Sequence, residues 1–512
     1  MKAFTKSLSL VLALLMLVLC FASCGGGKET ETETEAGGEK ETQAPVVTET
    51  EDPRQSVKVD LPEDLNFANA ADNTITFFVR NDNDMWTKEM DVDELTDDTL
   101  WDAIYTRNAN VEQKLGVTIT TVAQLGSWSY RNTWNETLRN AVNTKSGDFD
   151  TAAIYMSTGS SLAVEGMYYN LLDFPNLTLS KPWWNQVIQE ETTLFDTMYY
   201  LAGDIAISEV AGGLCLFFNK TMFEELNPGL DLYQMVWDGE WTIDLMYDFV
   251  EAAWEDTNSN GVTDNGDTIG FMVGALDSVS DGGMDSWVSA MGLRLTEMEE
   301  GIPVLSFYNE RSIAAFEKVQ KLHADNTGTL AGGSGLNPDS TFALGKALFA
   351  RSTLNGGSGL RDMTQPYGVI PMPKFDEEQE NYQTSSDNTV SLVVVLASTP
   401  ADKLEMVGAT LEHMAAESYK NVTPAYYEVV LKSKYSNDPR DAEMYDSILQ
   451  TFVYTFGFVY STLSIAGIGN LFRNVTLDFA QQYEANATKY ETALELLIDK
   501  LDEIAFNTQY GQ

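Results

Sequence analysis

Alternating strand-like and helix-like patterns between residues 74 and 156 limit the folds open to this chain more than any other feature. Three apolar runs are typical of β-strands: Thr74–Val79, Val117–Val122 and Phe149–Met156. Between them, apolar residues recur at helical spacing over Leu100–Leu115 and Tyr130–Val142. This order of strands and helices predicts a parallel sheet with right-handed crossovers. The chain is therefore expected to have an α/β fold.

A second stretch, Tyr199–Lys220, predicts a junction between two such units. It contains two short apolar runs, Leu201–Ile207 and Leu214–Asn219, joined by a segment with Glu209 and a glycine pair. The second run is almost continuous in apolar residues, as expected for a strand buried on both faces. We interpret the joint as a hinge between two α/β lobes, with Glu209 at the floor of the cleft between them. A hairpin turn with a solvated glutamate is the alternative interpretation.

The charge of the chain excludes several classes of function. Its 512 residues contain 77 Asp and Glu against 31 Lys and Arg, which gives a formal net charge of −46. Nucleic acids and anionic lipid surfaces repel such a chain, so we expect no nucleic-acid partner. With 44% hydrophobic and 11% aromatic residues, the chain can still form cores for two or three domains or for one large two-lobed body.

Few residue patterns support an enzyme. The two histidines, His323 and His413, lie ninety residues apart within helix-like runs, which argues against a histidine metal site or a catalytic triad. No nucleophile elbow, P-loop or dinucleotide-binding glycine pattern occurs. A glycosidase needs only two carboxylates, and 77 acidic residues make any pair uninformative. We therefore expect no catalytic residues and no catalytic cofactor.

The N-terminus has the features of a bacterial lipoprotein signal. Two lysines precede an apolar run, Leu8–Ala22, that is too short to be a stable membrane span. The small residues before Cys24 resemble the lipobox at which signal peptidase leaves a lipid-bearing N-terminal cysteine, although Phe21 stands where leucine is usual. This predicts a signal peptide over residues 1–23 and a lipid on Cys24. An ordinary secretory signal is the alternative.

A low-complexity acidic segment follows the signal. Residues 25–52 carry nine acidic residues against two lysines and almost no large apolar side chain. Such a segment cannot bury enough surface to offset its ordering entropy. We expect residues 24–72 to form a disordered tether that holds a folded body at the outer face of the cell membrane. Cys215 is the only cysteine of that body, so we expect no internal disulfide.

Several longer motifs in the body resemble one protein family. They are KLGVTI at Lys114–Ile119, GDFDTAAIY at Gly147–Tyr155, the crossover Ala202–Lys220, the run Pro366–Tyr382, and SDNTVSLVVVLAS at Ser386–Ser398. In order and spacing they resemble the extracellular solute-binding proteins, family 1, of sugar ABC importers. The resemblance is to the maltose-binding-protein branch, in the form common among Gram-positive gut anaerobes, and it covers roughly residues 73–512.

This resemblance implies a class II, two-lobed, periplasmic-binding-protein-like α/β fold with hinge crossovers. It assigns residues 73–210 and 349–392 to the N-lobe, and residues 211–348 and 393–512 to the C-lobe. Buried strand-like runs at Ala347–Leu354 and Val390–Ala397 agree with more than one crossing between lobes. An amphipathic stripe that begins at Tyr483 is expected to pack on the second lobe.

The sharpest local motif is the acidic loop between residues 256 and 267. Oxygen donors stand at positions 1, 3, 5, 7, 9 and 12 of a calcium-binding loop, which are Asp256, Asn258, Asn260, the carbonyl of Val262, Asp264 and Asp267. Gly261 occupies position 6, where such a loop turns sharply. A strand-like run follows the loop, so it has no paired helix, and Asp at position 12 reaches less far than Glu. The pattern predicts one structural Ca²⁺ site, with an acidic surface turn as the alternative.

Candidate ligand-binding residues follow the predicted strands, because open α/β sheets bind ligands beyond the carboxyl ends of their strands. Asn81, Asp82 and Trp86 follow the first strand, and Ser157 and Ser160 follow the third. The resemblance adds residues near the family's ligand-contacting segments, which are Glu209, Asp277, Trp287, Asn355 and Asn470. Glu209 and Asp82 are expected to accept hydrogen bonds from sugar hydroxyls, while Trp86 and Trp287 stack on sugar faces. A place in the core is the alternative for each tryptophan.

Together these patterns predict a lipid-anchored extracellular solute-binding protein that delivers a mono- or oligosaccharide to an ABC importer. The expected partners are the carbohydrate, the transmembrane subunits of the permease, and the bacterial membrane through the lipid on Cys24. We expect a monomer that closes about its hinge when ligand contacts both lobes. The alternative is a surface lipoprotein that captures or hydrolyses glycans without a transporter.

Overall fold

The computed structural model describes residues 52–273, 285–331, 341–360, 362–431, 438–460, 471 and 478–510. Contacts divide the chain into two units, Met1–Asp52 and Pro53–Gln512. All that follows concerns the second unit. The predicted signal peptide over residues 1–23 and three predicted site residues, Cys24, Asp277 and Asn470, fall wholly outside the described residues.

The first sheet contains the predicted alternation of strands and helices. Its four strands lie in the order β11-β3-β1-β2, with bounds Ser391–Val395, Thr151–Tyr155, Thr74–Arg80 and Thr118–Gln124. Strand β1 pairs in parallel with β2 and β3, while β11 joins β3 in antiparallel register. Helices α3 (Thr99–Leu115) and α4 (Arg131–Thr144) form the two crossovers. The prediction for residues 74–156 is confirmed.

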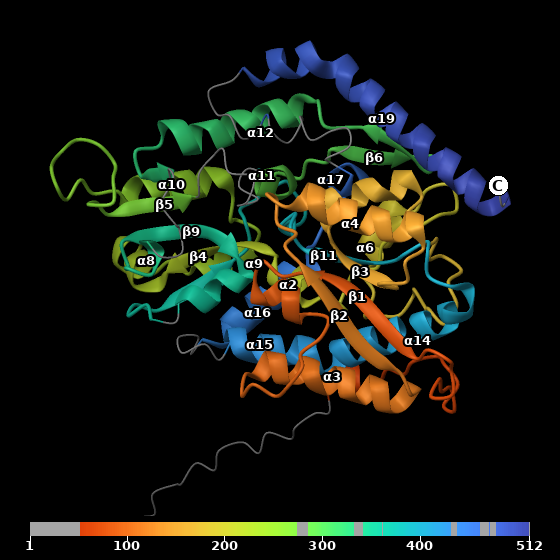
Figure 1. The fold of residues 1–512 in the computed structure, drawn as a ribbon. Coiled ribbons are helices and arrows are strands. Elements are labelled where there is room, and N and C mark those ends of the chain that lie inside the picture. The colour runs from red at the N-terminus through yellow and green to blue at the C-terminus, as the bar shows by residue number, and fades with distance from the viewer. Residues whose placement is uncertain are drawn as a thin grey trace, which may run out of the picture. The chain divides into compact units, whose positions relative to one another are not determined.

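Both faces of the first sheet are buried. In β1, Phe77 and Val79 belong to one hydrophobic core and Phe78 to another. The same alternation in β11 sends Val393 to the first of these cores and Leu392 to the second, as the two-residue period of a strand requires. Helix α14 (Leu404–Glu417) runs beside α3 along one of these faces (Figure 1). Burial on both faces explains why β3 and β11 are nearly continuous in apolar residues, whereas β2 is partly exposed and more polar.

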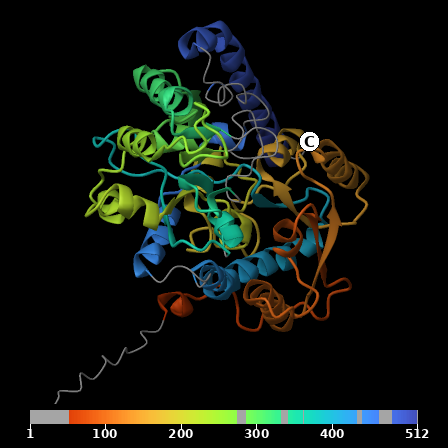
Figure 2. The ribbon, with the colours of Figure 1, turned by 90° about the vertical axis from the view of Figure 1, so that its left-hand side faces the viewer.

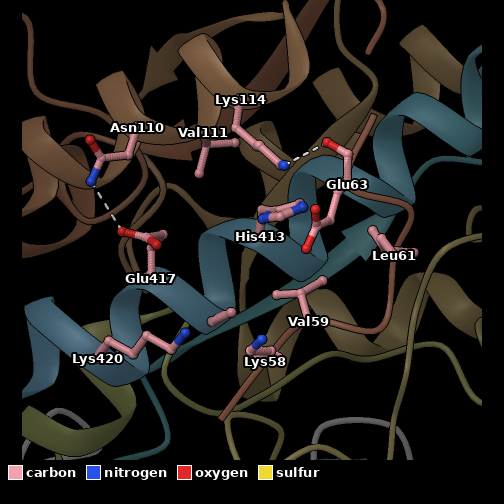
Figure 3. A pocket seen from close by; sticks show the side chains of 11 residues that line it. Lys58, Val59, Leu61, Glu63, Asn110, Val111, Lys114, His413, Glu417 and Lys420 are labelled. Atoms are coloured by element: carbon pink, nitrogen blue, oxygen red, sulfur yellow. Dashed lines mark hydrogen bonds between the residues drawn. The ribbon is translucent and has the colours of Figure 1, made fainter. Parts of the chain in front are cut away.

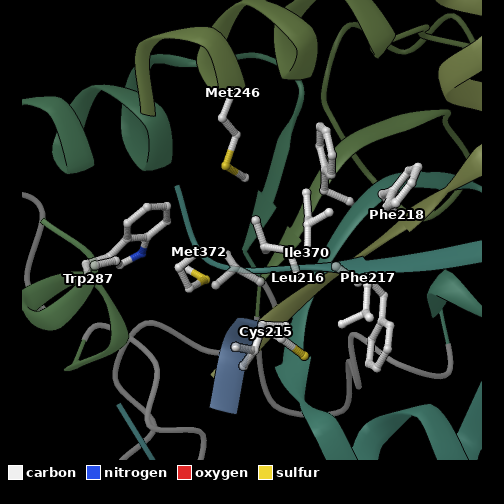
Figure 4. Packing of buried hydrophobic residues seen from close by; sticks show 14 of the residues in the cluster. Cys215, Leu216, Phe217, Phe218, Met246, Trp287, Ile370 and Met372 are labelled. Carbon is white, nitrogen blue, oxygen red and sulfur yellow. The ribbon is translucent and has the colours of Figure 1, made fainter. Parts of the chain in front are cut away.

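The second sheet is mixed and has the order β10-β4-β9-β5-β8. The bounds of these strands are Tyr367–Ile370, Leu214–Asn219, Ala347–Thr353, Ile269–Val273 and Thr329–Ala331. Strand β4 is antiparallel to β9 and β10, whereas β5 is parallel to β8 and β9. The buried side chains of Cys215 and Phe217 point to one side of β4, while Phe218 points to the other (Figure 4). The predicted strand Leu214–Asn219 is confirmed.

The other elements surround these two sheets. The longer helices are α10 (Ile243–Ala253), α12 (Glu310–Gln320), α15 (Thr423–Leu431), α16 (Pro439–Gln450) and α19 (Phe479–Tyr510). The short helices are α2 (Asp84–Lys88), α5 (Met156–Gly159), α6 (Gln186–Thr192), α7 (Ile207–Ala211), α8 (Lys220–Leu226), α9 (Leu232–Trp237), α11 (Asp285–Ala290) and α17 (Phe456–Val459). Single 3-10 or π turns are η1 (Pro53–Ser56), η2 (Ser160–Glu165), η3 (Lys321–Asp325), η4 (Leu354–Leu360), η5 (Ala401–Lys403) and η6 (Ser418–Val422). Strands β6 (Thr296–Glu299) and β7 (Ile302–Leu305) form a hairpin.

The predicted division into lobes is wrong for three strands. We expected residues 349–392 in the first lobe and residues 393–512 in the second. Strands β9 and β10 instead pair with β4 in the second sheet, and β11 lies in the first sheet beside β3. The sequence of an apolar strand does not indicate which sheet the strand will join, because its pairing partner lies far away in the sequence. The return to the first sheet therefore comes between β10 and β11.

The expected tether is too long, because residues 53–72 are part of the folded body. Val57, Val59 and Phe67 are half-buried against one core of the first sheet. The backbone N–H of Phe67 donates to the carbonyl of Leu115 at 2.6 Å. Scattered apolar residues anchor this segment, and the acidic composition of the neighbouring residues concealed them. We call residues 57–67 the N-terminal strap.

Three crossings lie side by side between the sheets. The first, Gly212–Leu214, bonds to the second, Ser385–Asp387, through Asp387 N–H to Gly212 carbonyl at 2.8 Å and Leu214 N–H to Ser385 carbonyl at 3.1 Å. The third crossing passes through Val453, whose backbone N–H donates to the carbonyl of Thr384, next to the second crossing, at 2.8 Å. The predicted strand Leu201–Ile207 is wrong, because only isolated bridges and then α7 occupy this stretch. Gly203, at φ 123°, turns the chain out of the extended conformation.

Helix α19 packs on the core of the second sheet and on one core of the first sheet, rather than on the second lobe alone. Tyr483 and Tyr490 belong to the core of the second sheet, whereas Leu494, Leu497 and Leu501 belong to a core of the first. Figure 2 shows α19 beside α12, with which it is in contact. Within the described residues, no helix combines the length and apolar character needed to cross a bilayer.

Candidate ligand-binding cleft

A cavity of about 420 Å³ opens where the two sheets face each other across α7. One wall follows β1, another precedes β11, and a third follows β9. The lining consists of Asn83, Asp84, Met85, Trp86, Trp101, Ser208, Ala211, Gly212, Thr353, Asn355, Asp387, Thr389 and Val390. We call this cavity the cleft. Its position at the carboxyl ends of β1 and β9 is where open α/β sheets bind ligands.

The turn after β1 fixes the main aromatic wall of the cleft. Asn83 caps α2 and accepts the backbone N–H of Trp86 at 3.0 Å. This cap places the half-buried indole of Trp86 on the guanidinium of Arg80, 4.1 Å from the ring centroid. Asp84 pairs with Lys88 at 3.0 Å on the same helix. Local capping and a cation–π contact therefore hold the Trp86 ring in place.

A buried polar network supports the floor of the cleft. Arg80 donates to the Ser391 hydroxyl at 2.8 Å, and Ser391 donates to Glu89, whose second oxygen accepts the N–H of Ser208 at 3.2 Å. Burial lowers the pKa of Arg80 to about 10, which Glu89 partly counteracts, and burial raises the pKa of Glu89. Among the described residues, Nε and Nη1 of Arg80 have no hydrogen-bond partner. The network joins β1, α2, α7 and β11.

Two predicted ligand residues line the cleft, and two others lie beside it. Trp86 and Asn355 form parts of opposite walls. Asp82 accepts the backbone N–H groups of Gly126 and Ser127 at 2.7 and 2.9 Å, so it holds a loop instead of facing the cleft. The exposed Asn81 is not part of the lining. The expectation that Asp82 accepts sugar hydroxyls is therefore wrong in this conformation.

Three further predicted residues are buried in cores. Ser157 and Ser160 are 2% and 0% exposed, and the Ser160 hydroxyl donates to the carbonyl of Val459 at 2.8 Å. Trp287 is fully buried in the core of the second sheet, in edge contact with Phe271 and His323. It cannot offer a stacking face to a sugar. The alternative interpretation, a core tryptophan, holds for this residue.

Glu209 lies at the hinge but does not form the cleft floor. It sits on α7 with its carboxylate buried, where it accepts hydrogen bonds from the Asn185 amide at 2.5 Å, the Tyr454 hydroxyl at 3.1 Å and the N–H of Gly203. Burial raises its pKa. The cleft is lined by Ser208, Ala211 and Gly212 on the other side of α7. Glu209 thus holds neighbouring segments together through hydrogen bonds and does not face the cleft, where a ligand would bind.

A second cavity of about 390 Å³ lies behind α7, and Glu209 and Val210 line it. Its other walls include Trp184, Asp204 and Tyr427. Burial raises the pKa of Asp204 to about 7, although a hydrogen bond from the Thr423 hydroxyl acts to lower it. The five-residue helix α7 therefore separates two cavities. A movement of α7 would change both.

Sequence reasoning missed several residues of the cleft. Arg80, Asp84 and Asp387 are charged groups in or under its walls, and Trp101 supplies a second indole. The Asn-Asp-Asn-Asp-Met-Trp run after β1 was a visible signal for Asp84. Trp101 lies at helical spacing, which favours a core position, and Asp387 belongs to the second crossing. Only the fold brings these segments together.

The chemistry of the cleft suits a neutral ligand with hydroxyl groups. Two indoles, Trp86 and Trp101, offer flat apolar faces, while Asp84, Asp387 and Asn355 offer acceptors and one amide donor. Side-chain hydroxyls add groups that can donate or accept. The described lining contains no histidine or cysteine. Such a set can bind and orient a sugar.

The predicted calcium loop forms a closed turn with its acidic groups directed inward. Asp256 accepts the N–H groups of Asn260 and Gly261 at 3.1 and 2.8 Å, and Gly261 has φ 75° as expected for position 6. The amides of Asn258 and Asn260 donate to Asp264 at 3.0 and 2.6 Å. In the described part of the chain, no group of three His, Cys, Asp or Glu side chains converges as metal ligands. Calcium binding therefore stays a prediction.

Comparison with known proteins supports the fold at low sequence identity. No family model matches the chain, and no curated protein matches its sequence. The galacto-N-biose/lacto-N-biose I-binding protein of an ABC transporter from Bifidobacterium longum is 13% identical with a TM-score of 0.54, covering 84% of this chain and 98% of that one. A cyclo/maltodextrin-binding protein complexed with maltotetraose is 12% identical with a TM-score of 0.52, covering 84% and 97%. An ABC substrate-binding protein from Listeria monocytogenes, complexed with cycloalternan, is 13% identical with a TM-score of 0.50, covering 86% and 99%.

These similarities define the class of fold. The chain has the two-lobed α/β fold of periplasmic-binding-protein-like solute-binding proteins, as the sequence predicted. Its cleft lies between the two sheets, beside three crossings of the chain. All three similar structures are named as binding proteins, two of them as ABC-transporter or ABC substrate-binding proteins.

Proposed function

We propose that this protein is the solute-binding component of an ABC importer and that it captures a mono- or oligosaccharide in the cleft. The single observation that carries this proposal is the cleft itself. It combines two indole faces with carboxylate and amide groups, and both sheets contribute to it. The similar structures include proteins complexed with lacto-N-biose, maltotetraose and cycloalternan, which supports a carbohydrate as the ligand class.

Ligand capture would proceed by closure about the three crossings. Trp86 and Asp387 reach the ligand from the first sheet, and Thr353 and Asn355 from the second. A ligand that contacts both sides at once stabilises the closed form more than the open form, so it shifts the population toward closure. The permease subunits would then recognise the closed form. We expect the protein to act as a monomer and without catalysis.

The test is a panel of mono- and oligosaccharides measured by isothermal titration calorimetry with the purified protein. At least one neutral sugar should bind with 1:1 stoichiometry and be recovered unchanged. Chromatography of each mixture after incubation checks this last point. Absence of binding to every sugar would contradict the proposal. Release of shorter products would instead indicate a glycan-hydrolysing lipoprotein.

Two further parts of the proposal concern the surroundings of the body. A lipid on Cys24 would hold the protein at the outer face of a Gram-positive cell membrane, which the signal-like residues 1–23 support. Mass spectrometry of the mature N-terminus tests the lipid. A structural Ca²⁺ in the loop 256–267 would pin that loop through oxygens of Asp256 and Asp264 with the Asn258 and Asn260 amides turned to present oxygen.

A further inference from the structure

A third cavity, of about 300 Å³, lies away from the cleft and contains an unusual group of basic side chains (Figure 3). Lys58 comes from the N-terminal strap, Lys114 from α3, and Lys420 from η6. His413 of α14 lies among them. We call this cavity the lysine pocket.

The ammonium groups of the lysine pocket lack carboxylate partners. Among the described residues, Lys58, Lys114 and Lys420 form no ion pair, and the one hydrogen bond that their ammonium groups make is from Lys114 to the carbonyl of Glu63 at 2.7 Å. Lys403, by contrast, is paired with Asp150 at 2.9 Å. Three lysines from separate segments thus line one cavity, and none of them is ion-paired with the carboxylates described there.

The carboxylates of the lysine pocket do not neutralise it. Glu417 accepts the side-chain amides of Asn110 and Asn421, both at 3.1 Å, and Glu63 contributes the other carboxylate of the lining. Three lysines against two glutamates leave a local formal charge of +3 − 2 = +1 in the lining. A ligand with two negative charges would therefore meet donors that the protein itself does not use.

His413 in the same pocket also has a polar atom without a hydrogen-bond partner among the described residues. This atom is Nε2, which is buried. Burial, together with the positive charges of Lys114 and Lys420, lowers the pKa of His413 to about 4. The imidazole is therefore neutral at pH 7 and has one N–H to donate. A buried polar atom left without a partner is costly, which points to a missing ligand.

The remaining lining tells which class of ligand would fit. Val59, Leu61, Val111 and Ala416 form apolar parts of the wall next to the charged groups. A tetrahedral oxyanion can accept charge-assisted hydrogen bonds from several donors, and the lining offers three lysines and the imidazole of His413. From this arrangement, we propose that the lysine pocket binds a phosphate group, either as free phosphate or as the headgroup of a phospholipid. The proposal does not depend on the sugar-binding function.

The two histidines allow a direct test by NMR of the full-length protein with ¹³C-labelled histidine and Cys24→Ala to prevent lipidation. His413 lies in the pocket, whereas His323 is 7% exposed and packs against Phe271 and Trp287 in the second core. Titration with inorganic phosphate should shift the His413 signal in a saturable way and leave His323 unchanged. A shift of both signals, or a linear shift without saturation, would contradict specific binding.

A charge-matched pair of variants locates the site. Lys58→Gln/Lys420→Gln should weaken phosphate binding by at least about tenfold, because two of three contacts to the anion are lost. Lys489→Gln/Lys500→Gln, on the exposed face of α19, should leave it unchanged. Equal affinity in both variants would overturn the proposal. An unchanged His323 signal shows that each variant is folded.

Vesicles distinguish the two sources of phosphate. If the ligand is a lipid headgroup, the same protein should co-sediment with phosphatidylglycerol vesicles and not with phosphatidylcholine vesicles, and Lys58→Gln/Lys420→Gln should abolish this. If the ligand is free phosphate, only the soluble ion should shift His413. A protein that responds to neither probe has no phosphate site in this pocket.

Discussion

Arg80 is the residue on which the cleft wall depends most. Its guanidinium is fully buried, 4.1 Å from the Trp86 ring centroid and 5.1 Å from that of Tyr155. Burying a charge is costly unless it is paired, and Ser391 and Glu89 supply the compensation. The buried charge and its partners hold a surface rigidly in place. In this protein, that surface is the indole of Trp86.

The first prediction concerns this indole. Trp86→Ala should weaken binding of the sugar found in the panel by about tenfold, the factor that a loss of about 1.4 kcal/mol produces, because a flat apolar face is removed. Trp237→Ala, 40% exposed on α9, is the matched control and should leave the affinity unchanged. Calorimetry measures both. Full affinity in Trp86→Ala would place the ligand elsewhere.

The second prediction concerns Asp204, behind α7. Its pKa is raised to about 7 by burial, with the Thr423 hydroxyl, Glu209 and Arg54 facing it. Between pH 4 and 7 the folded protein therefore holds a proton that the unfolded chain has released. The free energy of unfolding should fall as pH rises through this window, by at most about 1.4 kcal/mol per pH unit from this group.

Asp204→Asn removes this proton exchange. Relative to wild type, the variant should gain stability between pH 4 and 7, and the difference should level off above pH 7. Urea unfolding at four pH values measures it. Other buried carboxyls titrate in both proteins and cancel in the difference. Parallel pH profiles would mean that Asp204 is not the protonated group.

At the scale of elements, α7 and its glycines decide how close the sheets come. A Cβ on Gly212 would lie 2.5 Å from Cγ1 of Val390 and 2.9 Å from the carbonyl of Ser208. A Cβ on Gly213 would meet Phe452 at 2.9 Å. The glycine pair is therefore required by close approach of the crossings and not by a positive φ.

The third prediction follows from this packing. Gly212→Ala should lower the free energy of unfolding by about 1–3 kcal/mol, because the added methyl forces α7 away from the segment before β11. Sugar affinity should fall as well, since Gly212 lines the cleft. Gly359→Ala is the control, because its Cβ would have no neighbour within 4 Å, and it should change stability by less than about 0.5 kcal/mol.

The fourth prediction concerns the loop 256–267. If it binds Ca²⁺, calcium at a hundredfold excess over its dissociation constant should stabilise the folded protein by about 2.7 kcal/mol. Asp256→Ala should remove the effect, because position 1 is lost. Asp248→Ala, exposed on α10 just before the loop, should retain it. Thermal unfolding with calcium and with a chelator measures the shift. If the wild-type protein shows no shift, the loop is an acidic surface turn that does not bind calcium.

At the scale of the whole molecule, two long helices join the halves in addition to the crossings. Helix α3 contributes Leu100 and Ile104 to the second core and Val111 and Leu115 to the first, and α19 is shared in a similar way. Closure must therefore occur with these helices sliding or bending on one of the cores. Such small shear movements of packed helices are an established mode of domain closure.

The fifth prediction is that closure accompanies binding. Small-angle scattering should show a smaller radius of gyration when the bound sugar is present at saturation, because ligand contacts from both sheets favour the closed form. Trp86→Ala should need more sugar for the same change. Binding without any compaction would argue for a rigid glycan-capturing protein instead.

Local sequence was sufficient for much of the fold. The alternation of periods near two and near 3.6 predicted β1, α3, β2, α4 and β3, because these patterns follow from how each element buries one or both faces. The almost continuous run at Leu214–Asn219 likewise predicted β4. Trp86 lines the cleft, as expected for a residue that follows the end of β1, while its contact with a ligand stays a prediction.

The assignments that failed depend on contacts between distant segments. Nothing local distinguishes Trp287, which fills a core, from Trp101, which lines the cleft. The sheet that β9, β10 and β11 join is decided by pairing with strands more than a hundred residues away, and that pairing sets where the lobes divide. The sequence by itself determined the elements and their class of fold. Only the tertiary structure decided which side chains face the cleft, because burial belongs to the packed arrangement and not to any one stretch of chain.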